Sequence, residues 1–216
     1  MFRPALQIAL AKITMVRLTP LLAAPLLLSA APPAALPLQI VDAAGMPLGD
    51  AVIEIARPAG DGRAPAFRWR NAMAQKNLAF VPGTLIVARG TSVAFPNLDT
   101  VRHSIYSFSK PAPFKIDLYG RDQTRTQRFD VSGTVALGCN IHDQMRGYIR
   151  IVDTPYAART DGNGLAEVDG LAQGTYTVTV WHPRMKGAGG EWRGTVTASP
   201  GKRTRIVVPV RAIGAR

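Results

Sequence analysis

The sequence predicts an all-β protein, on three observations. Short apolar or alternating segments recur along the chain, as half-buried strands require. Glycine and proline separate these segments, and the chain holds 20 Gly and 17 Pro among 216 residues. No window after residue 35 shows a sustained apolar period of about 3.6 residues with capping residues, so long helices are not expected. Many short strands joined by Gly/Pro turns are typical of a sandwich or barrel.

The expected strands follow one another along the whole chain. The first two expected strands cover 38–42 and 51–55. A loop rich in Pro, Gly and Arg follows them at 57–65. Six more are expected in the middle of the chain, at 80–87, 91–95, 104–108, 128–131, 133–137 and 147–152. The last three cover 175–181, 195–197 and 205–210. At most one short helical turn is expected, at 69–77.

The first 35 residues have the features of a signal peptide. They contain no acidic residue, and the basic residues Arg3, Lys12 and Arg17 precede an apolar run at 18–30 that small residues follow. The run is shorter than the ~20 residues that a bilayer span needs. We therefore expect an exported, periplasmic chain without a membrane span after cleavage; a retained membrane anchor is the alternative. Met15 is an alternative start.

The chain is strongly basic, with a formal net charge of +12. The basic residues are scattered and do not alternate with aromatic residues, so nucleic-acid binding is not expected. A positive surface of this kind favours encounter with an acidic protein partner or an anionic surface. A generally basic soluble surface is the alternative reading.

Cys139 is the only cysteine, so no internal disulfide can form. An exposed thiol in an oxidising compartment is readily oxidised, and burial or metal ligation protects it. His142 and Met145 follow Cys139 at three-residue intervals, and His103 lies 36 positions upstream. By composition alone, a cysteine has this His and Met spacing only about once in 2,600 cases. Two His, one Cys and a weak axial Met are the ligands of a mononuclear blue-copper site.

The motifs around these residues resemble the cupredoxins over roughly 72–152. They are Phe80-x-Pro82, the run Gly90-Thr-x-Val93-x-Phe95-x-Asn97-x-Asp99 followed by His103, and Cys139-x-x-His142-x-x-Met145, whose short spacing is amicyanin-like. The resemblance implies a Greek-key sandwich, a single copper ion bound by His103, Cys139, His142 and Met145, and His142 as the route for electrons. The overall layout also resembles exported cupredoxin-like proteins labelled as methylamine-utilisation proteins.

Two residues near the ligands bear on this resemblance. Ser104 stands where the cupredoxins have Asn, so its hydroxyl or backbone N–H would take over the role of the amide. Asn97 is a candidate for fixing the ligand loop, and a plain turn residue after a strand is the alternative.

Residues outside the cupredoxin-like part resemble the transthyretin-like domain found beside carboxypeptidases. The first piece is Val41-Asp-x-x-Gly45-x-Pro47-Leu-x-x-Ala51-Val, and the second is Thr160-Asp161-x-x-Gly164 followed by Gly174-x-Tyr176-x-Val178. The resemblance implies a small β-sandwich made of 36–60 and 153–212. The cupredoxin-like part, 72–152, would then be inserted in this sandwich or packed on it.

The resulting interpretation is an exported, monomeric copper protein that carries single electrons between redox proteins, one of which is expected to be acidic. A copper carrier or storage protein and a non-redox interaction module are the alternatives. Enzymatic activity is not expected, because three His are too few for a multicopper oxidase and no group orients Cys139 and His142 as a nucleophile pair. Zinc would need Asp143 in place of Met145. His182 is expected to be a surface residue at a strand end.

Overall fold

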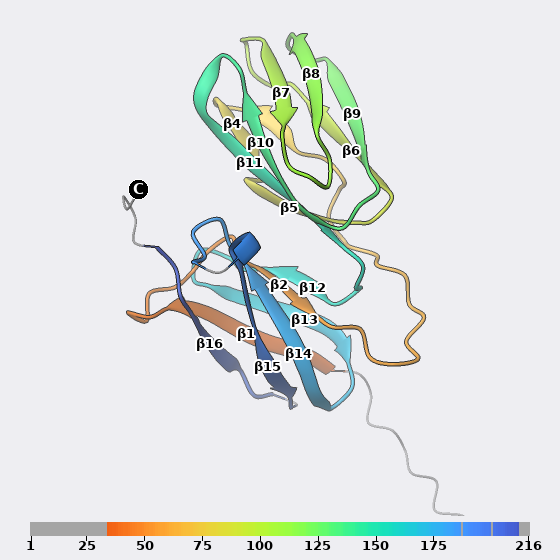
Figure 1. Ribbon diagram of the computed structural model, residues 1–216, viewed down its shortest axis with the longest axis vertical. Coiled ribbons are helices and arrows are strands. Elements are labelled where there is room, and N and C mark those ends of the chain that lie inside the picture. The colour runs from red at the N-terminus through yellow and green to blue at the C-terminus, as the bar shows by residue number, and fades with distance from the viewer. Residues whose placement is uncertain (1–33, 187, 200, 212–216) are drawn as a thin grey trace, which may run out of the picture. The chain divides into compact units, whose positions relative to one another are not determined.

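Strands make up the regular structure of the described part of the chain, together with one turn of 3-10 helix at Ala188–Gly190. The computed structural model describes residues 34–186, 188–199 and 201–211 (Figure 1). The prediction of an all-β protein is confirmed. Across these residues no helix has the length and hydrophobicity to cross a membrane. The predicted signal peptide lies outside the described residues except for its last two, which begin the first strand.

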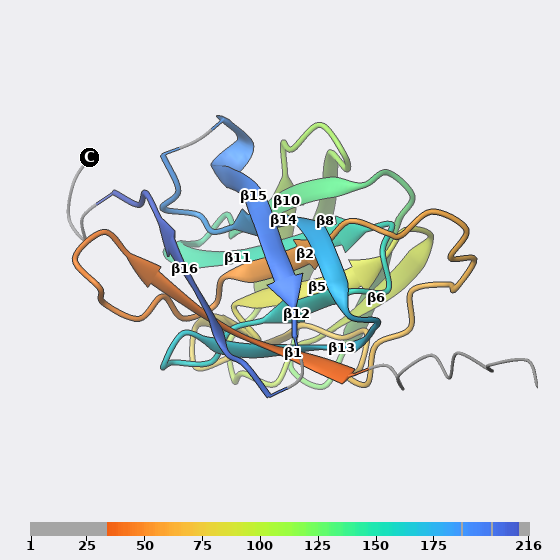
Figure 2. The same cartoon turned by 90° about the horizontal axis from the view of Figure 1, so that it is seen from below.

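Strands from the two ends of the chain share two sheets. The three-stranded sheet has the order β13-β1-β16, from β1 (Ala34–Asp42), β13 (Leu165–Leu171) and β16 (Thr204–Val208). β1 and β16 run parallel and lie side by side (Figure 2). The four-stranded sheet has the order β12-β2-β14-β15, from β2 (Val52–Ile55), β12 (Ala157–Arg159), β14 (Gly174–Trp181) and β15 (Glu191–Ala198). Apolar side chains of both sheets form one buried cluster, which includes Leu36, Ile53 and Val178.

The middle of the chain forms the remaining sheets. The five-stranded sheet has the order β5-β11-β10-β7-β8, from β5 (Thr84–Ala88), β7 (His103–Ser107), β8 (Phe114–Tyr119), β10 (Gly133–Cys139) and β11 (His142–Val152). Two strand pairs complete this part: β3 (Ala74–Lys76) with β4 (Ala79–Val81), and β6 (Thr91–Pro96) with β9 (Thr124–Phe129). Phe95, Phe129 and Ile149 belong to a second buried cluster that also contains Cys139. The three-stranded and four-stranded sheets, called the outer sheets below, were predicted to be transthyretin-like. That prediction and the predicted division into domains remain untested.

The structure corrects several details of the predicted elements. The helical turn expected at 69–77 is wrong, because β3 occupies 74–76 and pairs with β4. The strand expected at 80–87 is two strands, β4 and β5, separated by Pro82 and Gly83. Three further strands were not predicted: β8, β12 and β13. In β8, the first five residues of Phe114–Tyr119 alternate between apolar and charged, as in an edge strand.

A buried arginine connects the two groups of sheets. Arg150 of β11 forms ion pairs with Glu54 of β2 and Glu191 of β15, the latter at 2.8 Å, and its guanidinium also donates to Thr134 Oγ1. Burial raises the pKa of Glu54, and the neighbouring charge of Arg150 opposes this rise. A separate apolar cluster also joins strands of both groups, and it includes Val52 of β2, Ile86 of β5, Val152 of β11 and Trp181 of β14. Three ionisable side chains, each at most 20% exposed, are thus held together.

His182 is buried, at 7% exposure, so the prediction of a surface residue is wrong. It directly follows β14, and its Nδ1 accepts a hydrogen bond of 3.1 Å from the backbone N–H of Arg184. Burial lowers the pKa of His182 to about 4, and the charge of Arg184 contributes to this lowering. The ring is therefore neutral near pH 7.

The chain is expected to lose stability as the pH falls from about 6.5 toward 4, because the unfolded His182 takes up a proton in this range and the folded one does not. After allowance for solvent screening, we expect His182 to account for about 1 kcal/mol of the loss between pH 7 and 5. Replacing His182 with Asn retains an acceptor for the Arg184 N–H and removes this pH dependence. Urea unfolding of both metal-free proteins at the two pH values measures the difference; equal pH dependence would contradict the assignment.

Candidate metal centre

The strand order brings the three strongest candidate ligands to one end of the five-stranded sheet. Cys139 is the last residue of β10, and His142 begins β11 directly after a two-residue turn. β7 runs antiparallel to β10, with Tyr106 opposite Gly138, so the start of β7 lies at the end of β10. His103 is that first residue of β7. Residues 36 positions apart therefore meet because of the sheet register.

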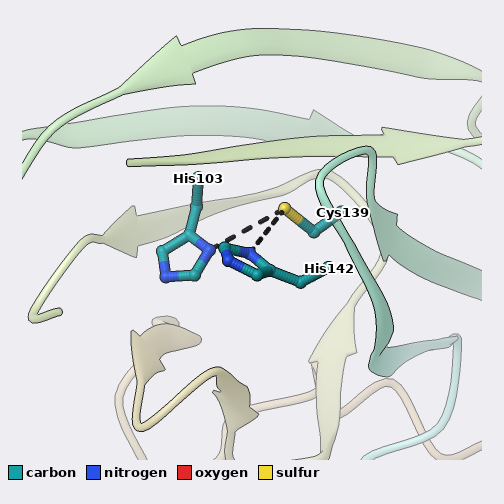
Figure 3. Close-up of side chains that lie close together, drawn as sticks. All are labelled: His103, Cys139 and His142. Atoms are coloured by element: carbon teal, nitrogen blue, oxygen red, sulfur yellow. Dashed lines mark hydrogen bonds between the residues drawn. The ribbon is translucent and has the colours of Figure 1, made fainter. Parts of the chain in front are cut away.

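The three side chains converge on one point (Figure 3). Their ligand atoms all lie within 4.8 Å of one another. The Sγ of Cys139 lies 3.7 Å from His103 Nδ1 and 3.7 Å from His142 Nδ1. The two imidazole rings are tilted by 56°, with centroids 4.8 Å apart. Among the described residues, this is the only group of three or more His, Cys, Asp or Glu side chains with such spacing.

This geometry fits a first-row transition metal ion. Sulfur and nitrogen bonded to one ion by bonds of about 2.3 and 2.0 Å that meet near 120° lie about 3.7 Å apart. Both sulfur–nitrogen distances here have that value. One thiolate with two imidazoles is a mixed soft and borderline donor set, which suits copper in both of its common oxidation states.

Asp99 fixes the orientation of the His103 ring. The Nε2 of His103 lies 2.8 Å from Asp99 Oδ2, whereas the other ring nitrogen, Nδ1, faces Cys139. An ionised carboxylate only accepts hydrogen bonds, so this contact favours the His103 tautomer with its hydrogen on Nε2 and a lone pair on Nδ1. The pKa of Asp99 is lowered: partial burial opposes ionisation, but the backbone N–H groups of Leu78 and Asn77 and the His103 ring stabilise the carboxylate. The sequence motifs gave Asp99 no role of its own.

Asn97 and Ser104 hold the segments on either side of His103. The buried Asn97 accepts the backbone N–H of Asp99 and donates to the carbonyls of Val101 and Tyr119. Ser104 Oγ accepts the backbone N–H of Asn140 at 3.1 Å, so β7 is tied to the turn between Cys139 and His142. The same hydroxyl lies 3.9 Å from Cys139 Sγ. Asn97 is thus a loop anchor, and Ser104 uses its hydroxyl as an acceptor.

Met145 lies on β11, three residues beyond His142. It is buried in the same apolar cluster as Cys139, next to Arg146, which pairs with Gly138. Its assignment as a weak fourth ligand stays a prediction. Asp143, the residue that a zinc site would require, is exposed and does not belong to the converging group.

The three donors differ in their access to solvent. His103 and Cys139 are buried, whereas His142 is half-buried. Four exposed apolar side chains lie on the loops and turns that carry the site: Leu78, Leu98, Val101 and Ile141. His142 is therefore the donor nearest to solvent, and apolar groups lie on the neighbouring segments.

Comparisons with known proteins find similarity only at the level of structure. No family model matches the chain, and no curated protein does. A copper-containing nitrite reductase from Thermus scotoductus SA-01 matches 45% of this chain with a TM-score of 0.38 and 24% identity. The match spans only 26% of the length of that reductase.

Two cupredoxins give comparable similarity. The Cu(I) form of a mutant amicyanin matches 38% of this chain and 80% of its own length, with a TM-score of 0.36 and 19% identity. A purple cupredoxin from Nitrosopumilus maritimus matches 38% of this chain and 96% of its own length, with a TM-score of 0.34 and 20% identity. The assignment of a function therefore depends on the residues of this chain.

Proposed function

We propose that this protein is an exported copper protein of the cupredoxin type, which transfers single electrons between redox proteins. The convergence of two imidazole nitrogens and one thiolate at metal-ligand spacing carries the proposal. His103, Cys139 and His142 would hold the ion, with Met145 as a weak axial ligand. Copper would supply the Cu(I)/Cu(II) couple.

The protein's own contribution is to keep the donors in place. Asp99 orients His103, and Ser104 ties β7 to the turn that carries the other two donors. The sheet register fixes Cys139 against His142. Ligands that keep their positions when the oxidation state changes lower the reorganisation energy of electron transfer. A rigid ligand set therefore favours an electron carrier over a protein that releases its ion.

We further propose that electrons pass through His142 to a partner that docks on the apolar residues around it. Lys76, Arg102 and Arg146 are exposed on the same loops and strands, and the whole chain carries a positive charge. Such a surface favours encounter with an acidic redox protein. The outer sheets would serve as scaffold, and we propose that the protein acts as a monomer.

Voltammetry of the copper-loaded full chain tests electron transfer directly. We expect a reversible one-electron wave and slow loss of Cu(I) to an added chelator. A copper carrier would give fast exchange with the chelator and no reversible wave. A protein that binds no copper would instead be an interaction module, and the proposal would be wrong.

A further inference from the structure

We infer that Asp99 and the β3–β4 turn form a device that sets the protonation pattern and the electron-donating strength of His103. The inference rests on the proposed metal-binding function, because it assigns residues that prepare one of the ligands. Asp99 would act as a positioning residue, since it contacts His103 and does not belong to the converging group of donors.

The first step is the contact between Asp99 and His103. The imidazole of His103 has no exposed surface, and its two nitrogens have separate partners: Asp99 Oδ2 at 2.8 Å from Nε2, and Cys139 Sγ at 3.7 Å from Nδ1. A hydrogen bond at one ring nitrogen determines which tautomer forms. Asp99 thereby favours a lone pair on the nitrogen of His103 that faces Cys139 Sγ, as a shared ion would require.

The second step is the way the chain holds Asp99. The backbone N–H of Asn77 donates to Asp99 Oδ1 at 2.5 Å, and that of Leu78 donates to Oδ2 at 3.0 Å. Asn77 and Leu78 form the turn between β3 and β4, and both have positive φ, of 54° and 57°. Asn tolerates this left-handed region, whereas Leu adopts it at a cost of about 1 kcal/mol or more. The chain accepts this strain at a turn whose two N–H groups both point at the carboxylate.

The third step is the electrostatic consequence. A carboxylate hydrogen-bonded to the far nitrogen of a ligating imidazole makes that ligand more basic and fixes its orientation. A more basic ligand favours the more highly charged state of a bound ion. Asp99 is therefore expected to strengthen binding of divalent ions and to lower the reduction potential of a bound copper.

The test compares Asp99→Asn with Asp117→Asn in the full chain. Both substitutions remove one negative charge, but the side chain of Asp117 is 87% exposed on β8 and pairs with Lys115. At position 99 an amide would either turn its NH₂ toward His103, and so favour the wrong tautomer, or turn it toward the N–H groups of the β3–β4 turn.

We expect Asp99→Asn to reduce Co(II) affinity by about 10- to 100-fold. If Cu(II) binding weakens tenfold more than Cu(I) binding, the potential rises by about 59 mV. Asp117→Asn should change neither quantity.

Nitrogen NMR of the metal-free wild-type protein tests the first step without any variant. We expect His103 to carry its hydrogen on Nε2 in the wild type. A hydrogen on Nδ1 in the wild type would overturn the inference, as would equal Co(II) affinities and potentials for the Asp99 and Asp117 variants. If the wild type has the expected tautomer but binds neither Co(II) nor copper, the proposed function fails while the orienting contact stands.

Discussion

Replacing Cys139 with alanine is expected to abolish copper binding at the proposed site. The substitution removes the only thiolate of the converging group and leaves two imidazoles. Loss of an outer partner of a ligand already costs about 10- to 100-fold in metal affinity, so loss of the ligand itself should cost more than about 100-fold. The visible colour of the Cu(II) protein, which depends on the thiolate, should disappear completely. Absorption spectroscopy and a competition titration with a chelator measure both effects.

Ser104→Ala is the comparison variant for this experiment, because it removes a hydrogen bond that holds the ligand turn without removing a ligand. It removes a buried hydroxyl 3.9 Å from the same sulfur but keeps all the proposed ligands. We expect its copper protein to remain coloured, and circular dichroism should show both variants folded. A Cys139→Ala protein with unchanged copper affinity would contradict the assignment of the thiolate.

Replacing Arg150 with methionine is expected to destabilise the chain by about 3–5 kcal/mol, which is the usual cost of removing one partner from a buried ion pair. The substitution leaves Glu54 and Glu191 facing a site with no compensating charge from position 150. Because burial already raises the pKa of Glu54, this carboxyl should become protonated at a higher pH in the variant. Chemical denaturation of the metal-free proteins at pH 7 measures the loss.

Two further variants show whether the buried charge is the cause. Arg193 pairs with the same Glu191 but its side chain is 72% exposed, so Arg193→Met should cost no more than about 1 kcal/mol. Adding Glu54→Gln to Arg150→Met removes one of the uncompensated carboxyl groups and should recover part of the stability. Equal losses for Arg150→Met and Arg193→Met would contradict this account.

Local patterns in the sequence were sufficient for the fold class and for two of the three converging donors. Strand alternation and Gly/Pro turns predicted the β structure, and Cys139 and His142 lie close in sequence. His103 could be added because the resemblance to the cupredoxins included it among the ligands, at the end of a strand; in the structure it begins β7. The three side chains meet because β7 pairs with β10. The number and spacing of His and Cys residues in the sequence do not reveal this pairing.

Features that depend on tertiary contacts could not be predicted. Asp99 receives its hydrogen bonds from a turn 22 and 21 positions earlier, and a two-residue turn with Leu in the left-handed region has no clear sequence signal. Arg150 finds its partners 96 and 41 positions away. An aspartate four residues before a candidate histidine ligand was the one available sign of the Asp99 contact.

The most direct test of the central claim is the visible absorption and EPR spectrum of the full chain reconstituted with Cu(II). The His103, Cys139 and His142 geometry predicts an intense thiolate-to-copper absorption band and a compressed copper hyperfine splitting. A colourless protein, or one that holds only Cu(I), would contradict the assignment as an electron carrier.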